Sequence, residues 1–375
     1  MKISCVTVDR FRNMTEQSFS PGKGVNVIYG DNGQGKTNLI EAMWLFSGAR
    51  SFRGAKEQEL IPFGGSFVRM SLAFSDEQRE QTAEIAISGE KKLISLNSVQ
   101  LLSRAKLADV LHFVVFAPNH LSLVKEGPAG RRDFIDSCLC RMKPSYIETL
   151  YRFTRTVSHR NSLLKDIQRT NAPADTLDIW DERMAFLSAG LLKERAAFCE
   201  KLSPMAAAFY KGLSKEKESI SLCYRSTFSD AGRMLKSNID MSLPQPKLAC
   251  ELLYILGAMR KNDIAACQTT VGPHRDDLNL NLNAKPARAF ASQGQSRSIA
   301  LCLKLAEGKL LQSVFDDAPV MLLDDVLSEL DKERRAYLLR HISGMQTFIT
   351  CCDKQSFRGK ETRFFHMRGG VISEV

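Results

Sequence analysis

The sequence predicts an α/β protein in which a mixed β-sheet and an antiparallel meander carry an inserted, mainly helical lobe. Three observations lead to this fold class. Strand-like segments lie near both ends of the chain, the middle of the chain has helical spacing, and a glycine-rich loop joins a buried strand to a helix near the N-terminus. The chain has 375 residues, which is too long for one compact core and suits two or three lobes.

The N-terminal third contains the first predicted strands. KISCVTVDRF (2–11) and GVNVIYG (24–30) have strand character, and TNLIEAMWLF (37–46) has the pattern of a helix. Apolar residues alternate with polar ones over 66–98, which predicts an antiparallel meander with one buried face. The apolar run HFVVFAP (112–118) predicts another core strand.

From Gly127 onward the apolar spacing becomes helical, with a strand-like interruption at 219–228, and strand signals return after Thr269. The core sheet is therefore expected to be assembled from both ends of the chain. The predicted helices cover 127–142, 144–169, 175–202 and 247–267, and the later strands cover 278–283, 319–325, 346–352 and 362–370.

The amino-acid composition restricts the kind of binding partner and the cellular compartment that we expect. The 52 Lys and Arg exceed the 42 Asp and Glu, and a net charge of +10 favours a polyanionic partner. The ten cysteines include no CxxC pair, which speaks against zinc and fits reduced thiols in a cytoplasm. Early charges such as Arg10 and Arg12 argue against a signal peptide, and no apolar run approaches the ~20 residues needed to cross a bilayer. A soluble, cytoplasmic protein without membrane contact is expected.

The stretch GDNGQGKT, from Gly30 to Thr37, fits the P-loop pattern. Glycines let successive backbone N–H groups converge on an anion, and the positive end of the following helix points to the same place. Lys36 is expected to reach the β- and γ-phosphates of ATP, and the Thr37 hydroxyl to ligate Mg²⁺. A turn that binds nothing is disfavoured, because the motif is complete and correctly flanked. The predicted nucleotide-binding residues here are Gly30, Asn32, Gly33, Gly35, Lys36, Thr37 and Asn38.

A second part of the site is predicted where the apolar strand VMLLDD (320–325) ends in two carboxylates. In P-loop proteins the first such Asp holds Mg²⁺, so Asp324 is a predicted metal ligand together with Thr37. Asp325 lies one residue further on, where a base could polarise the attacking water, and Asp325 and Lys36 are the predicted catalytic residues. Alone, an acidic strand end would more simply cap the next helix, but the upstream P-loop favours the catalytic interpretation.

A further phosphate-facing segment, SQGQSR (292–297), precedes a predicted helix. Its hydroxyl, its glycine and free N–H groups stand at the positive end of that helix, although such a pattern alone is more often an N-cap. Its position upstream of Asp324 resembles the ABC-type signature, which in that class completes the ATP site of another subunit. The predicted nucleotide-binding residues of this segment are Ser292, Gln293, Gly294 and Gln295.

SELD (328–331) resembles the D-loop of the same class, whereas Thr350 stands where an ABC transporter usually presents a histidine. Together these motifs resemble the RecF family of bacterial recombinational-repair ATPases, which is related to SMC proteins. The similarity covers most of the chain. One departure is Pro-Asn-His-Leu at 118–121, where the family usually has Pro-Glu-Asp-Leu, and Ser296 is a minor second departure. The motifs that carry the resemblance are FRN (11–13), GDNGQGKTNLIEA (30–42), SFR (51–53), LVKEGPAGRRDFID (123–136), TTVGPHRDDL (269–278), ASQGQSR (291–297) and LLDDVLSELD (322–331).

The resemblance implies an ABC-type P-loop ATPase head with an inserted helical lobe. It implies ATP-dependent homodimerisation on single- and double-stranded DNA and a weak, DNA-stimulated ATPase in recombinational repair and replication restart. It also implies cooperation with RecR and RecO in loading RecA at single-strand gaps. The domains expected are the N-terminal part of the ATPase lobe with the P-loop at 1–120, a helical DNA-binding insertion at 121–268, and the C-terminal part with the signature, Walker B and D-loop at 269–375.

Charge in the helical region supports DNA independently. Residues 125–169 contain ten Lys or Arg against five Asp or Glu, an excess of five. Because no aromatic interleaving of these charges suggests base stacking, contacts are expected mainly with phosphates, although a solvated basic face is the usual alternative. The predicted DNA-binding residues are Arg131, Arg132, Arg152, Arg155 and Arg160.

The segment GPHRDD (272–277) invites a metal or catalytic interpretation through His274, Asp276 and Asp277. A tight turn entering a strand where two lobes meet is preferred, because no second ligand group lies at metal-binding spacing nearby.

Two other functional classes stay open. A nucleotide-binding subunit of an ABC transporter would need a histidine where Thr350 stands and a groove for membrane helices. A non-hydrolysing, nucleotide-gated scaffold would use the basic face to bind protein. ATPase measurements with and without gapped duplex DNA would separate the three.

Overall fold

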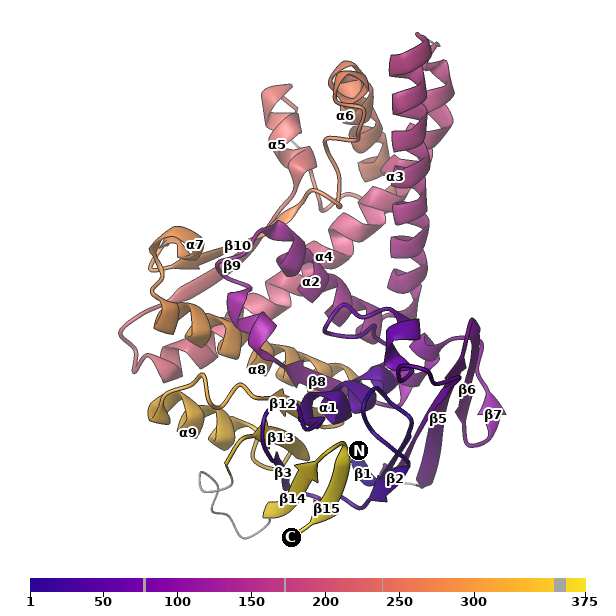
Figure 1. Ribbon diagram of the computed structural model, residues 1–375. Helices are drawn as coiled ribbons and strands as arrows, with labels where there is room; N and C mark the ends of the chain where they lie inside the picture. Colours follow the sequence, from indigo (N-terminus) through magenta and orange to yellow (C-terminus); the bar gives the residue numbers. More distant parts are fainter. Residues whose placement is uncertain (77–78, 172, 238, 354–361) are drawn as a thin grey trace. The chain divides into compact units, whose positions relative to one another are not determined.

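The computed structural model describes residues 1–76, 79–171, 173–237, 239–353 and 362–375 (Figure 1). The chain forms two compact units. The first, here called the α/β unit, contains both termini, and the second is here called the helical unit. The α/β unit comprises 1–122, 208–218 and 292–375, and the helical unit comprises 123–207 and 219–291.

These units differ from the predicted domains 121–268 and 269–375. The first predicted boundary lies two residues from the observed one, but 269–291 belongs to the helical unit. The reason is strand pairing, since β10 (Asp277–Leu282) forms an antiparallel ladder with β9 (Ile220–Arg225). The short segment 208–218 instead joins the α/β unit. The spacing of apolar residues does not reveal that 269–291 belongs to the helical unit or that 208–218 belongs to the α/β unit.

One sheet of the α/β unit is antiparallel. Its strands alternate buried and exposed positions, as in β4, where Val68, Met70, Leu72 and Phe74 are buried. The predicted meander over 66–98 thus forms the centre of this sheet, and β1 extends it. In spatial order the strands are β2 (Gln17–Phe19), β1 (Lys2–Asp9), β4 (Val68–Ser75), β5 (Glu80–Ser88), β6 (Lys91–Leu96) and β7 (Val99–Gln100).

The second sheet of this unit is mostly parallel and joins strands from both ends of the chain, as predicted. All but one of its neighbouring pairs are parallel, the exception being β14 with β15. The strands that precede the P-loop and carry the carboxylates, β3 and β12, flank β13. In spatial order the strands are β15 (Val371–Glu374), β14 (Thr362–Arg368), β3 (Val25–Tyr29), β13 (Thr347–Cys351), β12 (Val320–Asp324) and β8 (Phe113–Phe116).

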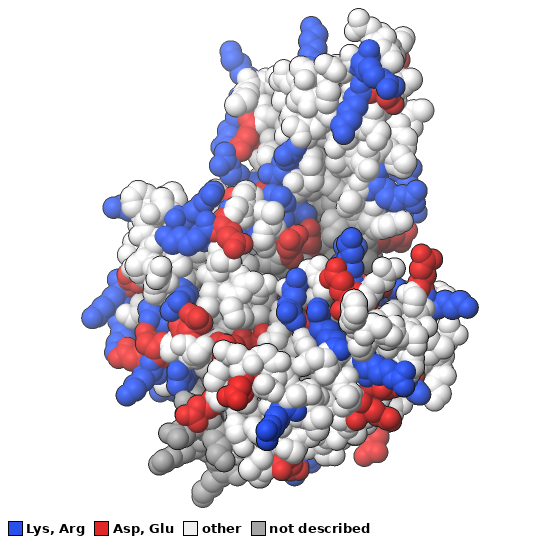
Figure 2. Space-filling view, in the orientation of Figure 1, with Lys and Arg blue, Asp and Glu red and all other residues white. Residues whose placement is uncertain are grey.

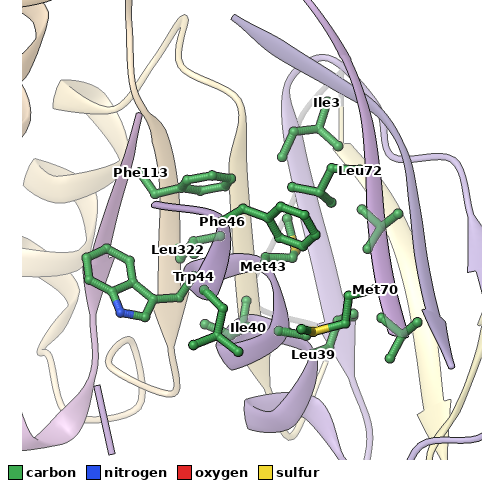
Figure 3. Close-up of a cluster of buried hydrophobic side chains, with 14 of the residues drawn as sticks. Ile3, Leu39, Ile40, Met43, Trp44, Phe46, Met70, Leu72, Phe113 and Leu322 are labelled. Carbon is green, nitrogen blue, oxygen red and sulfur yellow. The ribbon is translucent and has the colours of Figure 1, made fainter. Parts of the chain in front are cut away.

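Helix α1 (Lys36–Trp44) lies in the main core of the α/β unit, between side chains of both sheets (Figure 3). Leu39, Ile40 and Met43 are fully buried, and the following Phe46 packs in the same cluster. Seven of the nine residues of α1 are buried, including the polar Lys36 and Glu41. The core therefore fixes the position and direction of α1.

The remaining helices of the α/β unit include two that follow the predicted signature and D-loop segments, α8 and α9. Helix α8 is long and largely buried, whereas α9 is short and mostly polar. Short 3₁₀ helices of three to six residues lie in some of the connections. These helices are α8 (Gln293–Phe315), α9 (Lys332–His341), η1 (Leu45–Ser47), η2 (Glu57–Leu60), η3 (Arg104–Asp109) and η4 (Pro118–Ser122).

The helical unit is built from long helices and one small antiparallel sheet. The helices predicted at 127–142 and 144–169 are observed as α2 and α3, and the interrupting strand is β9. Helix α4 continues past the predicted end, and its last residues belong to the α/β unit. The elements are α2 (Pro128–Met142), α3 (Pro144–Thr170), η5 (Ala174–Leu177), α4 (Asp178–Leu213), α5 (Thr227–Met234), α6 (Gln245–Ala266), α7 (Ala287–Phe290) and the sheet β11 (Lys285–Pro286), β10, β9.

None of the helices in the described parts of the chain combines the length and the apolar character that a bilayer span requires.

We predict that Phe46→Ala lowers the free energy of unfolding of the α/β unit by about 3–5 kcal/mol, because Phe46 is buried and its removal leaves a cavity beside α1. Urea unfolding in a Trp180→Phe background reports on this unit, since Trp44 packs in the same core. The matched control is Phe63→Ala, at a fully exposed site, which should change it by less than about 0.5 kcal/mol. Equal losses for both variants would contradict this core.

Candidate functional site

The P-loop occupies the turn between β3, which ends at Tyr29, and α1, which begins at Lys36. Gly35 caps the helix with a φ of +108°, in the left-handed region that favours glycine. At Gly30 a Cβ would lie 2.2 Å from the backbone oxygen of Met367, so no larger residue fits without a shift. The glycines therefore let the chain pass close to β14 and turn into α1.

Lys36 is buried, and its ammonium group lies at the loop itself. Lys36 Nζ donates to the backbone oxygens of Gly30 at 2.6 Å and Asp31 at 2.9 Å. The N–H groups of the first turn of α1 lie at the same place, with the positive end of the helix dipole. A lysine and free N–H groups gathered in this way suit a phosphate group.

Asp324, at the carboxyl end of β12, is brought to the start of α1. Its Oδ1 accepts one hydrogen bond from the Thr37 hydroxyl and one from the Thr350 hydroxyl, both at 2.9 Å. Burial raises the pKa of the Asp324 carboxyl, although both hydroxyl groups oppose the shift. The structure thus brings Asp324 to Lys36 and Thr37, although Asp324 lies 287 positions after Thr37 in the sequence.

This donor set fits Mg²⁺. A threonine hydroxyl and a carboxylate are hard oxygen donors, and Mg²⁺ is usually held by one or two carboxylates together with substrate phosphates. Thr37 and Asp324 would supply such ligands beside the lysine. The ion, when bound, would neutralise phosphate charge and orient the phosphate groups. The assignment of both residues as metal ligands stays a prediction.

Thr350, which stands where an ABC transporter usually has a histidine, connects the two carboxylate residues. Its hydroxyl donates to Asp324 Oδ1 and accepts from the Asp325 backbone N–H at 2.9 Å. Thr350 lies at the end of β13, between the P-loop strand and the acidic strand. A histidine would have been recognised by its type, whereas the role of a threonine depends on strand order and register.

Asp325 directly follows β12 and has a φ of +52°, in the left-handed region, so the backbone departs from the extended conformation there. Its carboxylate Oδ1 accepts from the Ser328 hydroxyl at 3.2 Å, and its side chain is half-buried. Asp331 then caps α9 by accepting from the Arg334 backbone N–H. The predicted catalytic base is therefore held at the edge of the site by the following loop.

A polar cluster surrounds Glu41 of α1 and was not predicted as functional. Its arginines belong to FRN and SFR, two of the motifs that carry the family resemblance. Glu41 is fully buried in α1, and Arg12 binds it through two contacts of 2.7 and 3.0 Å. Arg53 lies 3.6 Å from Glu41 and donates to Asn38 Oδ1 at 2.9 Å. Asn38 in turn donates to Asn13 Oδ1 at 2.7 Å. Asn38, a predicted nucleotide-binding residue, is thus held by two partners at the start of α1.

The remaining predicted P-loop residues lie at the surface of the loop. Asn32 and Gly33 are exposed, and Asn32 Oδ1 accepts a contact of 3.2 Å from the Cys352 thiol. The neighbouring Gln34 binds the hairpin that joins β14 to β15, because it accepts from the N–H groups of Gly369 and Gly370.

The predicted signature segment begins α8 with a capping box. Ser292 Oγ accepts from the Gln295 N–H, and the Gln295 side chain accepts from the Ser292 N–H. Gln295 also donates to Glu218 at 2.5 Å, while Ser292 and Gln293 are exposed. Among the described residues no hydrogen bond joins Ser292, Gln293, Gly294 or Gln295 to the P-loop. Their role toward a nucleotide stays a prediction.

Two of the predicted DNA-binding residues are buried, and this corrects the prediction. Arg131 pairs with both oxygens of Asp277, at 2.7 and 3.0 Å. Arg160 is fully buried between Asp181 at 2.6 Å and Asp263 at 2.7 Å. Counting charges along a sequence cannot separate such internal pairs from surface charges. Both arginines hold the helical unit together and are not free to meet phosphates.

A third residue, Arg132, is half-buried and donates to the backbone oxygen of Asp276 at 2.8 Å. By contrast, Arg152 and Arg155 are exposed on α3. In the region of α3, α5 and α6, Lys and Arg prevail over Asp and Glu on the face shown in Figure 2. Arg152 and Arg155 are therefore the predicted DNA contacts that the structure leaves accessible.

The expectation that no aromatic residues accompany these charges was wrong. Tyr151 is exposed beside Arg152, and Trp180, at the start of α4, lines the same groove. Trp180 lies beyond α3 and outside the segment 125–169 in which the charges were counted, so the groove between α3 and α4 is what places it beside them.

His274, Asp276 and Asp277 are engaged in structural contacts within the helical unit. Asp276 accepts from Thr227 through its N–H and its hydroxyl, both at 2.7 Å, and Asp277 binds Arg131. Burial lowers the pKa of His274 to about 4, so this imidazole is neutral at pH 7. These contacts agree with the preferred structural role, although all three residues lie within one unit.

Asp324→Asn should raise the free energy of unfolding at pH 7, because burial raises the pKa of the carboxyl and penalises its charged form. In the unfolded chain this carboxyl has the ordinary pKa of about 4. The penalty on folding therefore grows as the pH rises from about 4 to the raised pKa of the folded state, and it is constant at higher pH. An amide avoids the penalty and keeps an oxygen for Thr37 and Thr350. Urea unfolding at pH 7 and pH 4 should show the gain shrinking toward pH 4.

The control for this prediction is Asp331→Asn. The Arg334 backbone N–H lowers the pKa of Asp331, so its charge is favoured by folding and its removal should not stabilise the protein at pH 7. A gain that is the same for both variants, or that is independent of pH, would contradict the role of Asp324 burial.

Comparison with known proteins places this arrangement in a family. Residues 2–370 match the model of the RecF/RecN/SMC N terminal domain. The chain is 37% identical to the DNA replication and repair protein RecF of Acetivibrio thermocellus over 361 residues, covering 96% of this chain and 95% of the relative. It is 38% identical to the protein of the same name from Heliobacterium modesticaldum over 382 residues, covering 100% and 99%.

Comparison with solved structures gives a result that agrees with the sequence matches. A structure of the recombination mediator protein RecF with ATPrS, from the RecFOR pathway, matches with a TM-score of 0.90 and 34% identity, covering 100% of this chain and 98% of that chain. An Smc head bound to the C-winged helix domain of ScpA matches with a TM-score of 0.54 at 16% identity, covering 100% and 98%, which shows the fold alone. The α/β unit thus has the fold of an ABC-type ATPase head, and the chain belongs to the RecF family.

Proposed function

We propose that this protein is an ATP-dependent DNA-binding protein of recombinational repair and replication restart, in which ATP hydrolysis acts as a dimerisation switch. The observation that carries the proposal is the meeting of Lys36, Thr37 and Asp324 at one edge of the parallel sheet. The names of the relatives, which are DNA replication and repair proteins, and a solved RecF structure with ATP support it.

In this proposal ATP binds with its phosphates on the P-loop. Lys36 faces the β- and γ-phosphates, and Thr37 and Asp324 hold Mg²⁺. Asp325 orients the attacking water. An aspartate reaches less far than the glutamate of many ABC-type ATPases, so it positions the water less well, and poor positioning costs on the order of 10²-fold in rate. Slow hydrolysis, stimulated by DNA, suits a switch whose ATP-bound form persists.

The signature segment is proposed to act on the nucleotide of a second copy. Ser292 and Gln293 are exposed at the N-terminus of α8, where the helix dipole favours negative charge. A nucleotide held by one P-loop would join the two copies through this helix end, giving an ATP-dependent homodimer. Ser292→Arg would then spare nucleotide binding by the monomer and block the dimer.

DNA, single- or double-stranded, is proposed to contact α3 through Arg152 and Arg155, whose exposed guanidinium groups suit phosphates. A relative belongs to the RecFOR pathway, which supports RecR and RecO as partners and RecA loading at single-strand gaps as the outcome. Phosphate release from ATP, measured with and without gapped duplex DNA, tests the proposal. If DNA does not change the rate of phosphate release, the alternative of a nucleotide-gated scaffold is favoured.

Asp325→Asn should keep ATP binding, trap the ATP-bound dimer and lower turnover by about 10²-fold, because the amide cannot accept a proton from water. Light scattering follows the dimer, and phosphate release follows turnover. The matched control is Lys36→Ala, which removes the charge opposite the phosphates and should prevent both nucleotide binding and dimerisation. If Asp325→Asn hydrolyses ATP at the parent rate, the base lies elsewhere.

Charge reversal at Arg152 and Arg155 (to Glu) should weaken binding of duplex DNA and reduce its salt dependence. Each phosphate contact contributes about −0.9 to the slope of log K against log salt, so losing two should flatten the slope by roughly 2. Fluorescence anisotropy over a salt series measures this. The control is reversal at Lys165 and Arg169, which are exposed on the same helix and change the net charge equally. Coinciding slopes for the two double variants would mean that the Arg152 region does not meet DNA.

A further inference from the structure

A groove lies in the helical unit between the N-terminal half of α3 and the start of α4. Its volume is about 520 Å³, within the ~300–1,000 Å³ common for ligand pockets. It is open to solvent along the exposed face of α3. The groove is lined by Glu148, Tyr151, Arg152, Arg155, Thr156 and His159 of α3 and by Trp180 and Arg183 of α4.

Flat side chains form much of this lining. The rings of His159 and Trp180 are stacked, with centroids 5.1 Å apart and planes 23° apart. At the other end of the groove Tyr151 is 60% exposed, and the guanidinium of Arg155 lies over its ring at 5.7 Å. Tyr151 thus presents its ring to solvent at the groove. Flat groups along one groove suit a flat ligand.

The charge of the groove is positive. Arg152, Arg155 and Arg183 face one carboxylate, Glu148, which lies 3.2 Å from Arg152. Two guanidinium groups are therefore not neutralised by a carboxylate of the lining. The ligand that matches aromatic rings and spare guanidinium groups is both planar and anionic.

The groove is also rigidly built. Arg160 and Asp181, the residues directly after His159 and Trp180, form a fully buried ion pair at 2.6 Å. Arg260 of α6 binds the other oxygen of Asp181, also at 2.6 Å. This buried pair fixes α3 against α4 one residue away from the stacked rings. The His159–Trp180 stack is therefore in place before a ligand arrives, which lowers the entropy cost of binding.

We propose that this groove binds an unpaired nucleotide segment, with a base stacked on the rings of Tyr151 or Trp180 and the flanking phosphates on Arg152, Arg155 and Arg183. The inference rests on the proposed DNA-binding function and deepens it. In a duplex the bases are paired and stacked on one another, so only a single strand can present a free base face. The groove would thus distinguish the single-stranded part of a gap from its duplex flanks.

Binding of phosphates alone would not require a groove lined by rings, since arginines on an open helix face would bind the phosphates of a nucleic-acid backbone equally well. An acidic protein segment would match the charge but would not need stacked rings. Base stacking is sequence-tolerant and typically contributes to single-strand binding at every aromatic platform. The combination of rings and guanidinium groups therefore favours a nucleic-acid single strand over a peptide.

Tryptophan fluorescence gives a direct test. The sequence has two tryptophans, and Trp44 is buried in the α/β unit. A dT oligomer added to the full-length protein with ATP and Mg²⁺ should quench Trp180, and the quench should vanish in Trp180→Phe. That variant keeps a ring, so its affinity by anisotropy should stay within about twofold of the parent. A quench that persists in Trp180→Phe would overturn the inference.

Affinity measurements separate stacking from charge. Tyr151→Ala and Trp180→Ala should each bind the dT oligomer about tenfold more weakly, while binding to an abasic oligomer of the same length and to duplex DNA stays unchanged. The matched control is Tyr254→Ala, which removes a 62% exposed tyrosine of α6 outside this groove and should have no effect. Thermal unfolding checks that each variant is folded.

The outcomes are distinguishable. If Tyr151→Ala and Trp180→Ala bind the dT oligomer as tightly as the parent, the stacking site is refuted even when DNA binding through Arg152 and Arg155 holds. Equal loss on dT and abasic oligomers also refutes it, because the rings would then act only on the backbone. If the parent binds no DNA at all, the proposed function fails with it.

Discussion

The burial of α1 between the two sheets of the α/β unit is the constraint on which the site depends. A helix that is enclosed by Leu72, Phe113 and Leu322 cannot shift without opening the core. The P-loop at its start is therefore held in one position. The same burial encloses Glu41, and a buried carboxylate is costly unless it is paired. Arg12 and Arg53 supply that pairing and at the same time fix the residues that follow Lys36.

Parallel strand order then brings the remaining groups to α1. Because β3, β13 and β12 are parallel neighbours, their carboxyl ends meet at one edge of the sheet. The P-loop follows the first, Thr350 is the penultimate residue of the second and Asp324 ends the third. Two hydrogen bonds to Asp324 Oδ1 join these ends. The chemistry of the site thus follows from register, in which Asp324 lies beside Thr350 and Thr350 beside Ile28.

The sequence predicted those elements of the fold that local patterns determine. Glycine spacing predicted the strand–loop–helix of residues 25–44, and alternation predicted the meander. The helix predicted after Arg297 is observed as α8, which begins earlier, at Gln293, because Ser292 and Gln295 form a capping box. Local patterns could not predict contacts between distant residues. Arg160 meets Asp263, which lies 103 residues later, and a basic residue that is buried in this way looks the same in a sequence as an exposed one. The assignment of 269–291 failed for the same reason, since only the pairing of β10 with β9 places it.

Helix α3 shows how one basic segment serves two physical purposes. His159 and Arg160 are consecutive, so successive side chains point about 100° apart around the helix and meet different environments. Arg160 is buried among carboxylates and determines how α3 packs on α4 and α6, whereas Arg152, Arg155 and His159 face the groove. The buried charges therefore supply rigidity and the exposed charges supply attraction. Because a rigid platform binds a flexible strand at lower entropic cost, the buried arginine would favour the nucleotide binding proposed for this groove without touching the ligand.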